Sequence, residues 1–246
     1  IYMKKLDYSI FISEETPWTK AKRKDSMGHY IVKCYSLLSL RMNANNRNGI
    51  ITPDKYCHHL KNWLDTIEDL IIPSSSLDDS KLPLTNAKKV LNSYFDINKN
   101  LEIEYSSSAK SFHKVPYQQL KEKSKSEFFD YYILLTTFDR WIDKINSKKA
   151  NSISFTIYID DKINDTMQTI IKDNLQNDLS LIFYRASIEK KCSVKISDNL
   201  NIFDSIFVFN RFLANIPRNI YYSDHNFKEY KRIITRNTYN FNIYKL

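Results

Sequence analysis

The stretch ISFTIYIDDKINDTMQTIIKDNLQNDLSLIFYRA, residues 153–186, decides the fold. Apolar residues alternate over Ile153–Ile159, which predicts a strand. Asp161 is placed to cap a helix over Ile163–Leu175, and Leu179–Ala186 has the composition of another strand. A strand, a helix and a strand in this order predict a right-handed parallel crossover unit.

The sequence that follows continues the α/β pattern. Cys192–Ile196 predicts a further strand. Asp198 is placed to cap a helix over Leu200–Ala214, although Ile206–Phe209 also fits a strand. The C-terminal residues show no clean period. We therefore expect a C-terminal α/β half with a small mixed sheet.

The N-terminal half has helical spacing, with apolar residues recurring at steps of three and four. Thr52 and Pro53 give the clearest helix start, because Thr caps a helix and Pro fits its first position. Ser26 and Thr85 are further candidate caps. The expected helices cover about 27–43, 53–72, 85–95 and 116–145, and 100–105 has strand character.

Two breaks suggest how the chain is divided. Residues 73–83 are rich in Ser and Asp and predict an exposed linker, and Ser106–Pro116 predicts a second break. The division expected is a helical N-terminal region, 1–112, and a region with a long helix, an α/β part and a basic aromatic tail, 113–246. The fold class expected is α+β and helix-rich, with the N-terminal half packed on or linked to the C-terminal half.

Composition excludes several classes of protein. With 42% hydrophobic residues in 246, the chain can build a core, so wholesale disorder is excluded. Only two glycines are present, which excludes glycine-rich phosphate loops, and no hydrolase, zinc-protease or dinucleotide fingerprint occurs. We therefore expect no cofactor, and a protein that is more readily explained as a binding subunit than as an enzyme.

The basic charge is a modest signal of a nucleic-acid partner. The net charge is +9, but Ile, Lys, Asn, Tyr and Phe supply 112 of 246 positions, and all have A/T-rich codons. An AT-rich genome therefore explains part of the lysine surplus. Cations and aromatic residues nevertheless alternate in the tail, a pattern typical of binding to phosphates and unpaired bases. The candidate nucleic-acid contacts are Lys20, Lys22, Arg23, Lys24, Arg218, Lys228, Tyr230, Lys231, Arg232, Arg236 and Tyr239.

A metal-dependent nuclease is an alternative. Asp160 and Asp161 end one expected strand, and Glu189 and Lys191 form an E-x-K pair after another. Carboxylates hold Mg²⁺ and a lysine orients the attacking water in such enzymes. This spacing resembles the core of restriction-type nucleases, although three common residue types at this spacing also arise by chance in a lysine-rich chain.

Metal binding by Cys and His has less support. Cys57, His58 and His59 are consecutive, and His29 and Cys34 lie on the expected first helix. None has the spacing typical of a zinc site, so no metal site is predicted. Three distant cysteines, no signal peptide and no long apolar run favour a reducing intracellular compartment without a membrane span, with the nucleus preferred over the cytoplasm or an organelle.

Three hypotheses about function remain. The first is a non-catalytic subunit of an intracellular macromolecular assembly, whose basic surface contacts RNA or DNA and whose partners include other protein subunits. The second is a protein–protein adaptor or scaffold without nucleic-acid contact. The third is the metal-dependent nuclease. A cluster of cations on one face would favour the first, and an exposed apolar patch the second.

Overall fold

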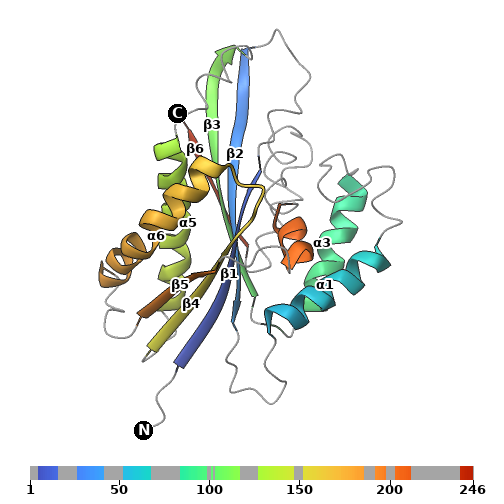
Figure 1. The fold of residues 1–246 in the computed structure, drawn as a ribbon. Helices are drawn as coiled ribbons and strands as arrows, with labels where there is room; N and C mark the ends of the chain where they lie inside the picture. The colour runs from blue at the N-terminus through green and yellow to red at the C-terminus, as the bar shows by residue number, and fades with distance from the viewer. Residues whose placement is uncertain are drawn as a thin grey trace.

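A six-stranded mixed sheet forms the centre of the protein in this computed structural model. The structure describes residues 5–15, 27–41, 52–67, 84–98, 101, 103–116, 127–146, 152–185, 192–197, 203–211 and 239–245. The spatial order of the strands is β5-β4-β1-β2-β3-β6 (Figure 1). Their bounds are β1 Lys5–Glu15, β2 Met27–Arg41, β3 Ile103–Pro116, β4 Ser152–Ile159, β5 Cys192–Ser197 and β6 Tyr239–Lys245.

Among these strands only β2 runs against the others. It pairs antiparallel with β1 and β3, whereas β4 is parallel to β1, β5 to β4 and β6 to β3. The carboxyl ends of the other five strands therefore lie at the same end of the sheet. In open α/β sheets, ligands bind at this end of parallel strands.

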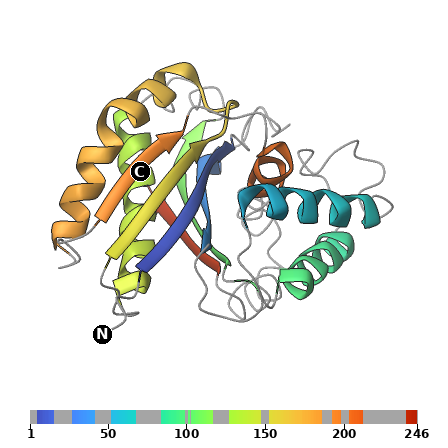
Figure 2. The same ribbon diagram turned by 60° about the horizontal axis from the view of Figure 1, so that its bottom comes forward.

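Helices cover both faces of the sheet (Figure 2). On one face lie α5 and α6, and on the other lie α1, α3 and a short helical segment, 203–211. The bounds are α1 Pro53–Thr66, α3 Leu84–Asn98, α5 Glu127–Asn146 and α6 Asp165–Arg185. Helix α6 connects β4 to the parallel strand β5, as a crossover requires.

Strand β1 is buried on both sides because it lies in the middle of the three layers. Leu6, Ile10 and Ile12 belong to the core beneath α5 and α6. Phe11 belongs to the second core, and its ring lies 5.7 Å from that of Phe207 in segment 203–211. Successive side chains of a strand point to opposite faces, so β1 contributes side chains to both cores.

Helix α5 packs on the sheet at small residues with hydroxyl groups. Trp141 Nε1 donates to Ser39 Oγ at 2.8 Å, and Thr137 Oγ1 donates to Ser108 Oγ at 2.8 Å. These four side chains are buried. Serine is small enough for a helix to approach closely, and its hydroxyl satisfies the polar groups that the helix buries.

Strands β2 and β3 extend beyond β1. Strand β1 pairs with β2 only as far as Cys34, while β2 continues to Met27 and pairs there with β3. Strand β6 accompanies β3 as far as Ser111. We call residues 27–33 of β2 and 110–116 of β3 the β2–β3 ribbon; it rises past the end of β1 in Figure 1.

Several expectations are confirmed. The chain is an α+β protein with a mixed sheet, and β4 and β5 lie where alternation predicts them. Helix α1 begins at Pro53, and Thr52 Oγ1 accepts a hydrogen bond from the Lys55 backbone at 3.4 Å. Segment 203–211 is helical, which resolves the alternative of a strand over 206–209.

The helix expected over 27–43 is wrong, because this segment is β2. Tyr35 and Leu37 lie in one core, and Leu38 and Leu40 lie in the other. A strand buried on both faces is apolar almost continuously, and such a run also satisfies helical spacing by chance.

The expected strand over 179–186 is also wrong, since α6 continues to Arg185. Its buried residues recur every fourth position through Leu179 and Phe183. The cap is Asn164 rather than Asp161, because Asn164 Oδ1 accepts from the Met167 backbone at 2.8 Å. The helix is thus longer than expected, and β5 completes the crossover.

The break expected over Ser106–Pro116 is replaced by β3, which continues through the proposed division at residues 112 and 113. Ser106 and Ser108 are buried. Strands from both proposed regions join in one sheet, since β1, β2 and most of β3 come from the first and β4, β5 and β6 from the second. The first region therefore contributes strands as well as helices, and the linker expected over 73–83 lies outside the described residues.

Candidate functional site

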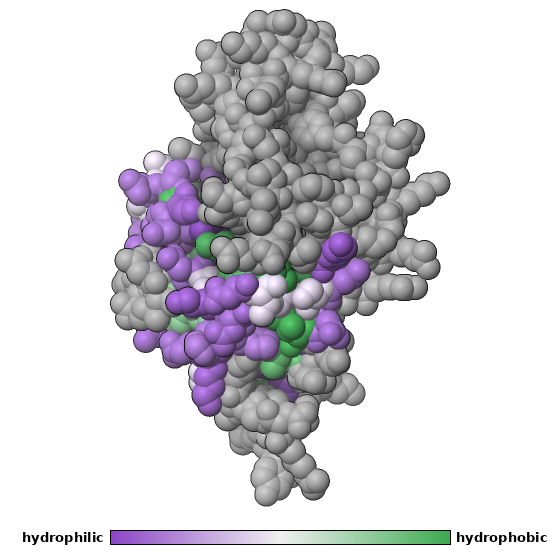
Figure 3. Space-filling view, turned by 90° about the vertical axis from the view of Figure 1, so that its right-hand side faces the viewer, coloured by the Kyte–Doolittle hydropathy of each residue, from purple (hydrophilic) through white to green (hydrophobic). Residues whose placement is uncertain are grey.

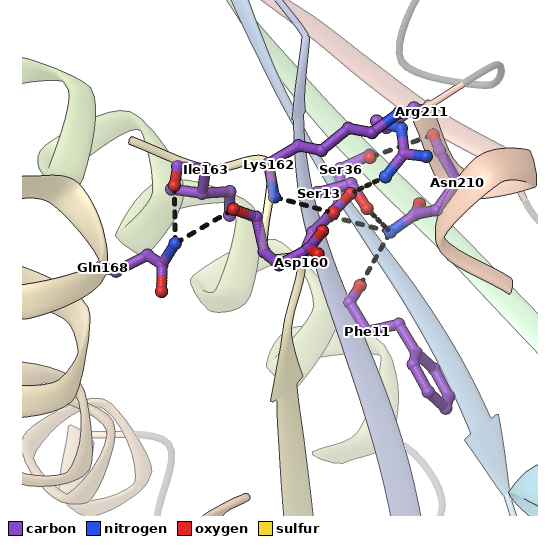
Figure 4. Close-up of polar contacts among 10 residues, drawn as sticks. Phe11, Ser13, Ser36, Asp160, Lys162, Ile163, Gln168, Asn210 and Arg211 are labelled. Carbon is purple, nitrogen blue, oxygen red and sulfur yellow. Dashed lines mark hydrogen bonds and ion pairs between the residues drawn. The ribbon is translucent and has the colours of Figure 1, made fainter. Parts of the chain in front are cut away.

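A buried polar cluster lies at the carboxyl ends of β1 and β4 (Figure 4). Asp160 follows the last residue of β4, and Ser13 lies near the end of β1, directly opposite Ser36 on β2. Asn210 and Arg211 reach this point from segment 203–211. All five residues are buried.

Asp160 and Arg211 form a buried ion pair. Arg211 NH1 lies 2.6 Å from Asp160 Oδ2, and the two side chains are 4% and 0% exposed. The other carboxylate oxygen accepts from the Lys162 backbone N–H at 3.1 Å. A buried carboxylate is stable in a protein when a cation and hydrogen-bond donors replace its water, and both are present here.

The electrostatics of Asp160 reflect two opposing effects. Burial raises the pKa of the Asp160 carboxyl above its usual value, because the charged form loses its water. The Arg211 guanidinium opposes this rise, and so do hydrogen bonds from the Lys162 backbone and the Ser13 hydroxyl. The carboxylate is therefore costly to bury without Arg211.

Asn210 connects segment 203–211 to two strands. Its Nδ2 donates to Phe11 O at 2.9 Å and to Ser36 O at 3.4 Å, and it lies 3.0 Å from Ser13 Oγ. The Ser36 hydroxyl in turn donates to Asn210 O at 3.2 Å. Neighbouring residues of one helical segment thus bind β1, β2 and the end of β4.

The β4–α6 turn beside the cluster is ordered by its own hydrogen bonds. Asp160 O accepts from the Ile163 backbone at 3.1 Å, and Gln168 Nε2 donates to Ile163 O at 2.6 Å and to Asp161 O at 3.2 Å. Figure 4 shows Gln168 reaching back to this turn from α6. The turn therefore presents Asp160 to Arg211 in one fixed position.

The polar groups of this cluster attach segment 203–211 to the sheet. Its carboxylate is engaged by Arg211, and Asn210 donates to strand carbonyls, so these groups fix segment 203–211 over the sheet. The nuclease hypothesis instead needs Asp160 to bind a metal ion. Asp161 is exposed in the turn, and Glu189 and Lys191 lie outside the described residues.

The Cys and His residues of the metal hypothesis are separated between two elements. Cys57, His58 and His59 lie on α1, whereas His29 and Cys34 lie on β2 instead of a helix. Within the described ranges, no group of three or more His, Cys, Asp or Glu side chains is placed to hold a metal ion.

Of the candidate nucleic-acid contacts, only Tyr239 lies among the residues that the structure describes. This residue begins β6 and is the register partner of Tyr105 in β3. The remaining candidates lie outside the described residues: Lys20, Lys22, Arg23, Lys24, Arg218, Lys228, Tyr230, Lys231, Arg232 and Arg236.

The β2–β3 ribbon is a second candidate region, and sequence reasoning missed it because 27–43 was expected to be helical. The ribbon contains Lys33, Lys110 and Lys114, two histidines, and no Asp or Glu. The register places Lys33 opposite Lys110, and Lys110 beside Tyr244 of β6. A row of basic and aromatic positions therefore crosses three strands.

Asn210 and Arg211 were also missed, although a signal exists. The run FDSIFVFNR, residues 203–211, is mainly apolar and ends in two adjacent polar residues. A polar pair at the end of a buried helix needs partners in the core. The sequence does not identify those partners, because they lie 51 to 199 positions away.

Comparisons with known proteins give no family for this chain. No protein-family model matches it, and no curated protein is detectably similar in sequence. In the part of the chain that the structure describes, none of the helices has both the length and the apolar character needed to cross a bilayer.

Proposed function

We propose that this protein is a non-catalytic subunit of a larger assembly that contacts nucleic acid through a basic surface. The observation that carries the proposal is the charge of the β2–β3 ribbon, which has three lysines and no acidic residue. Lysines attract phosphates and release counterions when they bind them. The ribbon lies at the end of the sheet where the parallel strands have their carboxyl ends, beyond β1 (Figure 1).

The non-catalytic part of the proposal is supported by the Asp160 cluster. A metal nuclease needs carboxylates that bind a cation, whereas the Asp160 carboxylate pairs with Arg211 at 2.6 Å. The energy of that pair contributes to holding segment 203–211 on the sheet.

Further basic residues come before β2 and before β6 in the sequence. Lys20, Lys22, Arg23 and Lys24 come shortly before Met27, where the ribbon begins. The tail cations Arg218, Lys228, Lys231, Arg232 and Arg236 precede β6, whose register partner is β3. We propose that these residues act with the ribbon, and that Tyr230 and Tyr239 supply aromatic contacts.

Fluorescence anisotropy with labelled DNA and RNA, single-stranded and duplex, tests this function. We expect an apparent Kd below about 10 μM at low salt, and a logarithm of affinity that falls linearly with the logarithm of salt concentration. Salt-independent binding, or no binding to any of the four probes, would contradict the proposal.

A protein–protein adaptor is the second candidate, and one observation favours it. Tyr132 on α5 and Leu181 and Tyr184 on α6 are 55%, 61% and 65% exposed. Large exposed apolar side chains are typical anchors of protein interfaces. If the protein is an adaptor, the wild type shows no salt-dependent binding to the four nucleic-acid probes. The variant Tyr132→Ser/Tyr184→Ser then captures less of the protein partner than the wild type does. Figure 3 shows the side of the molecule that carries α1 and α3, where hydrophilic residues surround smaller hydrophobic areas.

A further inference from the structure

We propose that a second copy of this chain docks on the outer edge of β5 and on the adjoining side of α6, so that the sheets of the two copies become continuous. This inference goes beyond the proposed function and does not rest on it, because the contact needs no nucleic acid. It assigns an occupant to a place where the end strand of the sheet and exposed apolar side chains of its covering helix lie side by side (Figure 2).

Strand β5 is open to pairing along its outer edge. It ends the sheet, and β4 is the one described strand that pairs with it. Its register with β4 runs evenly from Cys192 to Ser197, it contains no proline, and Ser193 and Lys195 are exposed. Native edge strands are commonly protected by bulges, prolines or a covering element. A regular edge without them presents backbone N–H and C=O groups to which a further strand can bind.

Helix α6 has an uncharged side next to this edge. Helix α5 packs on β2 and β3, whereas α6 packs on β5. Tyr131 of α5 donates to Asp178 Oδ2 at 2.6 Å, which identifies the side of α6 that faces α5. Because successive helical residues turn by about 100°, Ser180 and Tyr184 lie on the other side of α6, towards the outer edge of β5. The exposed residues there over 176–184 are all uncharged: Gln176, Asn177, Ser180 and Tyr184, with Leu181 next to them on the outward face.

The lack of charge on this strip suits a partner that carries the same net charge. The chain has a net charge of +9, so two copies repel each other wherever their cations approach. Tyr184 and Leu181 are 65% and 61% exposed, and large apolar side chains of this kind are typical anchors of interfaces from which charged residues are depleted. A second copy therefore meets the least repulsion at this neutral strip.

A twofold axis perpendicular to the sheet brings both layers into contact at once. It places β5 antiparallel to β5 of the second copy, and α6 beside the second α6 on the same face of the sheet. Phe183 of α6 stacks on Phe155 of β4, with ring centroids 4.9 Å apart, and Val194 and Ile196 of β5 pack in the same core. Helix α6 therefore lies over both β4 and β5.

The spacing of the two helices across this axis is that of packed helices. With strands about 4.8 Å apart, a helix centred between β4 and β5 lies about 10 Å from its copy, and packed helices are about 8–10 Å apart. Ser180 lies within the neutral strip, and its small side chain already donates to Gln176 O at 2.8 Å, so burial leaves its hydroxyl satisfied. A lone strand from another protein would pair with β5 but leave Tyr184 in water.

The new strand pair also avoids a contact between like charges. Lys195 is the one charged residue of β5, and alternation with Val194 and Ile196 puts it on the face away from α6. An antiparallel pairing centred on Val194 places Lys195 opposite Ser193 of the second copy rather than opposite the second Lys195. Six paired residues span only about 20 Å, so we expect a small interface and a dimer that dissociates in the micromolar range.

Sedimentation velocity of the full chain over about 1–200 μM tests the contact. We expect the wild type to shift with concentration from 29.3 kDa towards twice that mass. Ser180→Arg/Tyr184→Ser places a cation in the neutral strip and removes its aromatic anchor. The matched control Asn174→Arg/Tyr132→Ser makes the same two changes at exposed positions of α6 and α5 that lie outside the strip.

The strip variant should dimerise at least about tenfold more weakly than the wild type, and the control variant should stay within about twofold of it. Thermal unfolding of both variants should match the wild type, because all four side chains are exposed. Equal weakening by both variants, or a wild type that remains monomeric throughout, would overturn the inference. Growth into species larger than a dimer would overturn the twofold arrangement, because such an arrangement closes after two copies.

Disulfide cross-linking gives a second readout that needs no loss of binding. Ser180→Cys lies near the proposed axis and should form a dimer cross-link under mild oxidation, while Asn174→Cys, on the same helix, should not exceed the wild type with its native cysteines. Both substituted side chains donate to the carbonyl four residues earlier, so the two variants remove comparable local bonds. Equal cross-linking of the two variants would contradict the proposed contact.

Discussion

The two faces of the sheet are built in different ways. The α5–α6 face is assembled from consecutive segments, and its core is filled mainly by aliphatic and aromatic side chains of β1, β4, α5 and α6. The opposite face combines α1 and α3 with segment 203–211, which lies far from both helices in the sequence. It has an apolar core as well, but segment 203–211 is also held by polar contacts, such as Asn210 with Phe11 O and Arg211 with Asp160.

This difference shows two ways of specifying a position in a fold. A helix that directly follows its strand is already confined near the sheet, so apolar burial is enough to place it. Segment 203–211 comes soon after β5 but packs over β1 and β2, which lie two and three strands away from β5 in the sheet, and apolar contacts alone are non-directional. Directional hydrogen bonds and an ion pair select one position for it.

The largest expected effect comes from breaking the ion pair. Asp160→Ala leaves the Arg211 charge buried without its carboxylate and should lower the free energy of unfolding by about 3–5 kcal/mol. Urea denaturation followed by circular dichroism measures it. Asp160→Leu/Arg211→Met should recover most of the loss, because apolar residues need no partner; a double variant as unstable as the single one would show that the charge is not the cause.

A smaller loss is expected from Asn210→Ala. It removes the donor to Phe11 O and Ser36 O, two backbone acceptors beneath the helical segment. A lost buried donor of this kind costs about 1–3 kcal/mol, measured by the same denaturation. Hydrogen exchange should become faster in 203–211 and remain unchanged in α6. Equal acceleration in both would contradict the proposal that Asn210 positions segment 203–211 in particular.

On the opposite face, Trp141→Phe should cost less. It removes the donor to Ser39 Oγ but keeps most of the buried ring, and Ser39 has a further interaction. A single neutral hydrogen bond contributes about 1 kcal/mol, to be measured as a shift of the urea midpoint. A loss greater than that of Asn210→Ala would mean that polar contacts matter equally on the two faces.

Buried tyrosines make the stability of the protein depend on pH in the alkaline range. Burial raises the pKa of Tyr56 well above its usual value, and it raises the pKa of Tyr94, whose hydroxyl lies 2.9 Å from that of Tyr56. A raised pKa in the folded state means that stability is full below about pH 10 and is lost as pH rises further.

Tyr131 on the other face should contribute in the same direction, because burial and then Asp178 raise its pKa. Thermal unfolding of Tyr56→Phe/Tyr94→Phe and of Tyr131→Phe, from pH 8 to about pH 12, separates the two contributions. Each variant should lose stability less steeply than the wild type. An unchanged profile in the first variant would show that this tyrosine pair is not what titrates.

Prediction from the sequence succeeded where one local signal decided the structure. Thr52 and Pro53 begin α1 because a cap and a fixed backbone angle act within one turn, and β4 forms where apolar residues alternate. It failed at β2 because both faces of that strand are covered, and this depends on α5 and on segment 203–211 far along the chain. Asp160 was named only as a candidate metal ligand of a nuclease, which stays a prediction, and its partner Arg211 was not named.

The sequence by itself determined an α+β chain with a basic charge, the start of α1, the strands β4 and β5, and the polar residues available for burial. Only the tertiary structure decided that residues 27–41 form a strand, that Asp160 pairs with Arg211, and that lysines of β2 and β3 are register partners. The physical reason is range: caps and alternation act over a few residues, whereas burial on two faces and pairing across strands arise only when distant segments meet.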